Sequence, residues 1–173
     1  MMVELLSKHI RMKVQHAVDG SLINPDTVYL IPPKRQLTIE EGKLYLVEQA
    51  TVSGINLPID IFFRSLARDQ ENQAIAVILS GTGTDGTLGG RVVKEVGGYV
   101  LLQTPESAQF DGMPKSAIET GIADSIAPTE NMPHEILRYV EHPYASVLRN
   151  GPRLRTKKMY CTDFLLSFAK KLG

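Results

Sequence analysis

Two short apolar runs, at residues 74–79 and 99–103, constrain the fold of this chain more than any other feature. The first reads Ala-Ile-Ala-Val-Ile-Leu and the second reads Tyr-Val-Leu-Leu-Gln. Runs without polar alternation are typical of strands covered on both faces, as in parallel sheets. Residues 87–96 between them have helical spacing, and Gly97-Gly98 ends that helix. The stretch therefore predicts a strand–helix–strand unit with parallel strands.

The same alternation of strands and helices continues to residue 141. Further helices are expected at residues 3–11, 58–68, 113–120 and 133–141, further strands at 27–31 and 123–127, and a β-hairpin at 36–39 and 43–47. The predicted fold class is α/β, a doubly wound and mostly parallel sheet in a Rossmann-like three-layer sandwich with an inserted β-hairpin. Because no N-cap residue precedes the helix at 3–11, it is expected to be the last turns of a helix that is truncated at its N-terminus.

Charge divides the 173 residues into an acidic body and a basic tail. Residues 1–142 hold 12 Lys and Arg against 18 Asp and Glu, whereas residues 143–173 hold seven against one. The tail is expected to be a solvated linker followed by a helix at 160–172. Because the net charge is zero and the tail lacks interleaved aromatic residues, nucleic acid is not an expected partner.

The composition also bears on location and cofactors. No apolar run approaches the ~20 residues that span a bilayer, and the first residues do not resemble a signal peptide. We therefore expect no membrane insertion and a cytoplasmic location. Cys161 is the single cysteine, and no group of His, Asp and Glu has the spacing of metal ligands. Neither a metal nor another cofactor is expected.

The stretch most informative about chemistry is the glycine-rich loop Ser80–Gly86, which follows the first apolar run. In parallel sheets, ligand and catalytic groups lie in such loops at the carboxyl ends of strands. Glycines allow the backbone N–H groups to approach an anion or a developing oxyanion. Asp85 is either a catalytic carboxylate or a cap on the helix that begins near Thr87, and spacing alone leaves both interpretations open. A phosphate loop is not favoured, because no Lys follows and Asp85 would face the phosphate.

Several motifs together resemble one protein family. They are Ser80–Gly86, Gly97-Gly98, Gln109–Ile118, Pro58–Leu66 and the segment from Asp19-Gly20 to Pro32. In order and spacing they look like the catalytic domain of the chemotaxis receptor methylesterases, the CheB-type protein-glutamate methylesterases. The resemblance runs from about residue 5 to residue 140. It implies a methylesterase-like domain over residues 1–142 and a serine-type esterase that hydrolyses glutamyl methyl esters on methylated chemoreceptors, with deamidation of receptor glutamines in some members.

The resemblance also implies roles for particular residues. Asp85 matches the Asp of the family's triad, which would orient a histidine and stabilise its imidazolium form. Thr82 matches a position whose N–H helps to form the oxyanion hole, and Gly83, Gly86 and Met113 fall in the active-site loops. No role is assigned to Asp111. Some relatives carry a fused receptor methyltransferase domain, so a fused or associated methyltransferase is an expected partner.

The chain departs from the family pattern in its nucleophile and base. The family's Ser and His precede the helix that is seen here at residues 3–11, so the 173-residue chain alone is expected to be inactive. Ser80 is the nearest alternative nucleophile, although a hydroxyl that binds the loop backbone is favoured. None of the histidines, which are His9, His16, His134 and His142, shares a motif with a serine.

Two further expectations follow from this departure. The alternative function is a non-catalytic module that docks on receptors or scaffolds. A sheet without its first strands would expose an edge, so association into a homo-oligomer is expected.

Overall fold

The computed structural model describes residues 2–49 and 57–141, which divide into two compact units. The described parts of unit 1 are residues 2–16, 24–30 and 127–141, and those of unit 2 are residues 17–23, 31–49 and 57–126. The expected basic tail at 143–173 lies outside the described residues. Each unit is considered by itself below.

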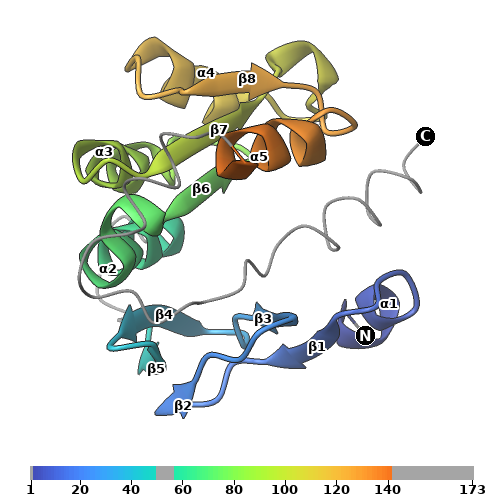
Figure 1. Cartoon of the computed structure of the whole chain (residues 1–173), viewed down its shortest axis with the longest axis vertical. Coiled ribbons are helices and arrows are strands. Elements are labelled where there is room, and N and C mark those ends of the chain that lie inside the picture. Colours follow the sequence, from blue (N-terminus) through green and yellow to red (C-terminus); the bar gives the residue numbers. More distant parts are fainter. Residues whose placement is uncertain (1, 50–56, 142–173) are drawn as a thin grey trace. The chain divides into compact units, whose positions relative to one another are not determined.

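The order of elements is that of an α/β protein (Figure 1). In chain order they are α1 (Met2–Ser7), β1 (Lys13–His16), β2 (Ser21–Leu22), β3 (Thr27–Leu30), β4 (Arg35–Glu40), β5 (Lys43–Glu48), α2 (Pro58–Gln70), β6 (Ile75–Ile78), α3 (Thr87–Glu95), β7 (Tyr99–Gln103), α4 (Gly112–Glu119), β8 (Ser125–Ala127) and α5 (Met132–Glu141), with short 3-10 turns at Glu71–Gln73 and Pro105–Ser107. The predicted fold class is confirmed.

The central sheet of unit 2 has the strand order β6–β7–β8. Strands β6 and β7 are parallel, with Ile75 opposite Tyr99 and Ile78 opposite Leu102. All five residues of β7 are buried, as expected for a strand covered on both faces. Because both strands run the same way, their carboxyl ends bring residues 79–86 and 104–112 to the same edge of the sheet.

Helices α2 and α3 lie side by side and share one apolar core with the sheet (Figure 1). The core contains Phe63 and Ala67 of α2, Val93 of α3 and the buried side chains of β6 and β7. The backbones of the two helices approach closely at Gly89, where an added Cβ would lie 2.7 Å from the Cβ of Phe63. Glycine at this position therefore sets how close α3 can come to α2.

The predicted hairpin is present and is longer than expected. Strands β4 and β5 pair antiparallel from Arg35 opposite Glu48 to Glu40 opposite Lys43. The two turn residues, Glu41 and Gly42, both have positive φ, which suits the twist of a two-residue hairpin turn. The sequence analysis missed strand β2, because it has only two residues. It pairs antiparallel with the edge of β5 that faces away from β4.

Two side chains of α2 fix this hairpin to unit 2. The N–H of Ile39 donates to Ser65 Oγ at 3.1 Å, and the N–H of Gly42 donates to Asp69 Oδ1 at 3.1 Å. The hairpin is therefore bonded to the helix that follows it as well as packed against it.

Unit 1 holds the parallel pair β1–β3, with Lys13 opposite Thr27. The helix predicted to reach residue 11 ends at Ser7, whose hydroxyl donates to Val3 O at 2.8 Å. Such a bond competes with the backbone hydrogen bonds that would continue the helix. The N–H groups of His9 and Ile10 both donate to Leu6 O, which closes a turn. The turn allows Ile10 to enter a small core with Met12 and Val14.

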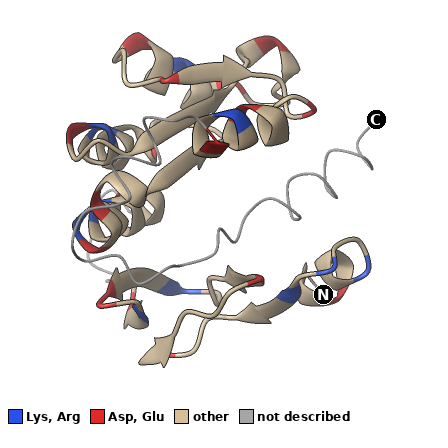
Figure 2. Ribbon diagram, viewed as in Figure 1, with Lys and Arg blue, Asp and Glu red and all other residues tan. Residues whose placement is uncertain are grey.

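Charged residues lie outside the central strands, and β6 and β7 carry none (Figure 2). This is the distribution expected when both faces of a strand are covered. Within residues 2–49 and 57–141, no helix is both long and apolar enough to cross a membrane.

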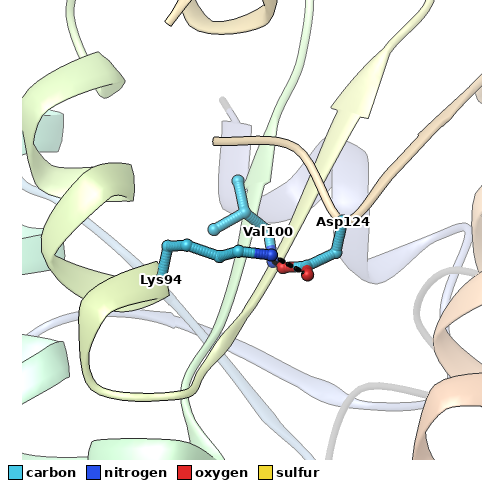
Figure 3. Close-up of polar contacts among 3 residues, drawn as sticks. All are labelled: Lys94, Val100 and Asp124. Atoms are coloured by element: carbon cyan, nitrogen blue, oxygen red, sulfur yellow. Dashed lines mark hydrogen bonds and ion pairs between the residues drawn. The ribbon is translucent and has the colours of Figure 1, made fainter. Parts of the chain in front are cut away.

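A carboxylate fastens the amino end of β7 (Figure 3). Asp124 Oδ2 accepts a hydrogen bond from the N–H of Val100 at 2.8 Å, and the N–H of Asp124 donates to Val100 O at 2.8 Å. Asp124 Oδ1 pairs with Lys94 Nζ at the end of α3. The segment before β8 is thus attached to both β7 and α3.

We predict that Asp124→Ala lowers the free energy of unfolding by about 1–3 kcal/mol, because the buried N–H of Val100 loses its acceptor. Lys94→Met is the control, since it removes only the partly exposed ion pair and should cost less than about 1 kcal/mol. Urea unfolding of both variants measures the difference. Equal losses would show that the ion pair, and not the backbone bond, holds this end of the strand.

Candidate functional site

The glycine loop, residues 80–86, leaves the carboxyl end of β6 and leads into α3. Gly83 has φ +84° and Gly86 has φ +90°, a region that residues with a Cβ rarely adopt. An added Cβ at Gly86 would also lie 3.1 Å from Cγ2 of Ile59 in α2. The loop therefore needs glycine for its backbone turns and for its approach to α2.

Hydrogen bonds join the glycine loop to the second loop, residues 104–112. The N–H of Gly81 donates to Phe110 O at 2.9 Å, and the N–H of Met113 donates to Gly81 O at 2.9 Å. The N–H of Phe110 donates to Ser80 Oγ at 2.9 Å. The Ser80 hydroxyl thus accepts from the loop backbone, which is the favoured structural interpretation of this serine.

Gln103, at the end of β7, fixes both loops with one neutral side chain. Its Oε1 accepts from the N–H of Ser80 at 2.8 Å, and its Nε2 donates to Ser107 O at 2.9 Å. The residue is 4% exposed. Because both ends of the amide are bonded, Gln103 sets the distance between the two loops.

Asp85 lies at the end of the glycine loop, and its carboxylate binds the first turn of α2. Oδ2 accepts from the N–H of Ile59 at 3.1 Å, and Oδ1 accepts from the N–H of Asp60 at 2.9 Å. The helix that follows Asp85 begins after Gly86 and has no side-chain cap. Asp85 is therefore a cap, but of α2 and not of the helix near Thr87 that the sequence suggested.

Two backbone amides lie in the glycine loop two and three residues before Asp85. Thr82 and Gly83 are exposed, and their N–H groups donate no hydrogen bond to another described residue. Met113 is half-buried and packs against the core beside Gly81. The loop thus presents free backbone donors close to a carboxylate that is held in place, an arrangement able to bind an oxyanion and orient a base.

No histidine belongs to the unit that contains Asp85. Among the described histidines, His9 follows α1, His16 ends β1 and His134 lies in α5, all within unit 1. His142 lies outside the described residues. Within the part of the chain that the structure describes, no three His, Cys, Asp or Glu side chains form a group suited to a metal ion.

Two residues that organise the site, Asp60 and Gln103, were missed by sequence reasoning. Gln103 could have been found from the sequence, since a polar residue at the end of an apolar strand indicates a buried side chain with hydrogen-bond partners. Asp60 is the third residue of a helix that begins with Pro58, a position where acidic residues are common. Nothing in the sequence alone indicated which loop these side chains contact.

The second loop carries an exposed ion pair at the start of α4. Lys115 Nζ lies 2.6 Å from Asp111 Oδ2. The hydrogen bond from Lys115 lowers the pKa of the Asp111 carboxyl below 3.8, and the same bond raises the pKa of Lys115 above 10.5. Both groups therefore stay charged over the neutral range.

Comparison with known proteins gives a family. The sequence model described as CheB methylesterase matches residues 1–136. The chain belongs to the CheB methylesterase family. It is 36% identical over 132 residues to the "Protein-glutamate methylesterase/protein-glutamine glutaminase of group 3 operon" of Rhizobium meliloti. The matched residues are 76% of this chain and 37% of that protein.

Two other relatives extend the comparison. A protein of Rhodobacter capsulatus, named "Uncharacterized 104.1 kDa protein in hypE 3'region", is 42% identical over 139 residues, which are 80% of this chain and 14% of that protein. The crystal structure of the Thermotoga maritima CheB methylesterase catalytic domain superposes with a TM-score of 0.72 at 31% identity, covering 80% of this chain and 76% of that one. The chain thus spans well under half of the length of the Rhodobacter capsulatus and Rhizobium meliloti proteins.

We predict that Lys115→Gln raises the pKa of the Asp111 carboxyl toward 3.8, because the variant loses the charged donor that now lowers it. The pair's contribution to stability should be present above about pH 4 and be lost as the pH falls through the lowered pKa of Asp111. For Lys115 the contribution should be present below about pH 10 and be lost as the pH rises through its raised pKa.

Carboxyl ¹³C NMR titration of Asp111 measures the shift. Glu119→Gln, on the same helix but outside the ion pair, should leave the titration of Asp111 unchanged. An unaltered titration in Lys115→Gln would contradict the assigned cause.

Proposed function

We propose that this chain supplies the orienting carboxylate and oxyanion loop of a serine-type protein-glutamate methylesterase of bacterial chemotaxis. The observation that carries the proposal is the Asp85 carboxylate, held by two α2 amides at the end of a glycine loop in which the N–H groups of Thr82 and Gly83 donate to no described residue. Family membership supports the reaction class, because relatives carry the name protein-glutamate methylesterase/protein-glutamine glutaminase. The substrates would be methylated chemoreceptors.

Each site residue has a role in this proposal. Asp85 accepts a hydrogen bond from the ring N–H of the catalytic histidine, which fixes the tautomer and stabilises the imidazolium. The N–H of Thr82 donates to the oxyanion, and Gly83 and Gly86 give the loop the backbone conformation that exposes it. Met113, in the first turn of α4, lines the site beside Gly81. No metal or other cofactor takes part.

The reaction follows from these roles. A serine hydroxyl attacks the ester carbonyl while the histidine takes its proton, and the carbonyl oxygen becomes an oxyanion. The histidine then returns the proton to the leaving methoxide, so methanol departs and a glutamyl ester of the serine remains. Water hydrolyses this acyl-enzyme by the same route. With a glutamine substrate the leaving group is ammonia, which is the deamidation named for the relatives.

The 173-residue chain made by itself should not complete this reaction. None of the four histidines shares a motif with a serine, and the Ser80 hydroxyl accepts a hydrogen bond from the N–H of Phe110. Loss of the nucleophile and base leaves only binding and oxyanion stabilisation.

A non-catalytic docking module is the second candidate. Phe110 favours it, because this aromatic side chain is 52% exposed beside the glycine loop and could contact a receptor.

The remaining parts of the proposal concern partners and location. A fused or associated methyltransferase follows from the family resemblance, and the Rhodobacter capsulatus relative, in which the matched segment is 14% of a 104.1 kDa protein, supports only that such a segment can belong to a much longer chain. A cytoplasmic location and association into a homo-oligomer complete the proposal. Light scattering of the purified chain tests the last of these, and a monodisperse monomer would contradict it.

We predict no methanol release from methylated receptor with the 173-residue chain, and release with a form that is extended upstream to include the family's Ser and His. In the extended form Asp85→Ala should lower kcat about 10³- to 10⁴-fold, because the imidazolium loses its counter-charge. Release of radiolabelled methanol measures both.

Glu95→Gln is the matched control, since it removes an exposed carboxylate at the other end of α3 and should leave kcat unchanged. Activity of the short chain would refute the need for upstream residues. Receptor binding by pull-down without hydrolysis, unaffected by Asp85→Ala, would instead support the docking module.

A further inference from the structure

Asp60 is a buried acid whose backbone N–H donates a hydrogen bond to the Asp85 carboxylate. It is the third residue of α2 and is 3% exposed. Its Oδ1 accepts from the N–H of Gly89, in the first turn of α3, at 2.6 Å. Burial of a carboxylate is costly unless it is hydrogen-bonded, so this contact compensates part of that cost.

The two acids cap each other's helices. Asp85 precedes α3 and accepts from the N–H of Asp60 in α2, while Asp60 in α2 accepts from Gly89 in α3. The first N–H groups of a helix have no partner within the helix and carry its positive dipole end. Asp60 of α2 therefore caps α3, and Asp85 of the glycine loop caps α2.

The close approach of the helices makes this exchange rigid. An added Cβ at Gly89 would lie 2.8 Å from Asp60 O, so α3 rests directly on the α2 backbone. The glycine loop, with Asp85 and the open amide of Thr82, leads directly into this anchored end of α3. A shift of the first turn of α3 away from α2 would carry Asp85 with it.

We propose that Asp60 is a positioning residue for Asp85. The inference rests on the proposed function, in which Asp85 orients the catalytic histidine. Without the Asp60 carboxylate, the buried N–H of Gly89 would lose its acceptor, and the start of α3 would no longer be held on α2. The two bonds from α2 to Asp85 would then lengthen or break, although neither involves the Asp60 side chain.

The surroundings of the second oxygen of Asp60 determine what the variant Asp60→Asn can test. Oδ2 is buried and has no hydrogen-bond partner among the described residues. Asp60→Asn can keep the acceptor for Gly89, but its NH₂ group would be buried without an acceptor and would lower global stability. Its effect on Ile59 is therefore measured beyond the global loss of stability. Asp60→Ala removes the acceptor altogether.

Amide hydrogen exchange of the 173-residue chain tests the positioning directly. The probe is the N–H of Ile59, which donates to Asp85. We expect Asp60→Ala to lower its protection factor about tenfold beyond any global loss of stability, since a bond to a charged group is lost. Asp60→Asn should restore protection to within about threefold of the unsubstituted chain.

Asp69→Ala is the matched control for exchange. Asp69 lies on the last turn of the same helix and accepts from Gly42, so its loss removes a similar bond far from Asp85. Its effect on Ile59 should be no larger than its effect on the core amides of β7. Equal effects of Asp60→Ala and Asp69→Ala on Ile59 would overturn the proposal. If Asp60→Ala does not fold, Asp60→Ser takes its place, because its shorter side chain withdraws the acceptor from Gly89, and unchanged protection of Ile59 in that variant overturns the proposal.

A kinetic arm separates this inference from the proposed function. In the extended, active form, Asp60→Ala should lower kcat with KM unchanged, and it should lower kcat no further when Asp85 is already replaced by Ala. Additive losses would mean that Asp60 acts independently of Asp85 and would overturn the inference. If Asp85→Ala alone leaves kcat unchanged, the proposed function fails, while the exchange result still decides whether Asp60 holds the Asp85 carboxylate.

Discussion

The parallel pairing of β6 with β7 is the constraint on which the candidate site depends. All of β7 is buried and β6 buries Ala76 and Ile78 in the same apolar core, so the register is fixed from Ile75 opposite Tyr99 to Ile78 opposite Leu102. That register brings the glycine loop and the second loop to one edge, where Gln103 and the backbone bonds of Gly81 join them. At the opposite end of β7, Asp124 holds the segment before β8. Polar side chains therefore anchor β7 at both ends. Gln103 acts at the carboxyl end, and Asp124, which follows the strand in sequence, acts at the amino end.

The sequence predicted most of unit 2 because its signals are local. Continuous apolar runs marked β6 and β7, and Glu41-Gly42 between alternating segments marked the hairpin. Signals at the edges were weaker. The first helix stops at Ser7, where a hydroxyl binds the preceding turn, and β2 is too short to have a pattern. Helix ends and two-residue strands depend on contacts that a periodicity does not contain.

The sequence singled out candidate site residues, whose catalytic roles stay predictions, but it did not predict their connections. Spacing brought out Asp85 and the glycines, and the family resemblance gave them roles. The partner of Asp85 was not predictable, because it is a helix that begins 27 residues earlier and meets the loop only in the folded unit. The same holds for Asp60 and Gly89, whose contact depends on the close packing of two helices. Interactions of this kind are long-range in sequence, so residue type and period cannot specify them.

The chemistry of Gln103 affects how the rate of the proposed reaction would depend on pH and salt concentration. The bridge between the two loops is an amide, which carries no charge and does not titrate in the range where proteins are folded. Its strength is also little affected by salt, because screening acts on charges. The separation of the loops is therefore insulated from acidity and ionic strength. A change of rate with either condition would report the reacting groups or the approach of the substrate, and not a rearrangement of this frame.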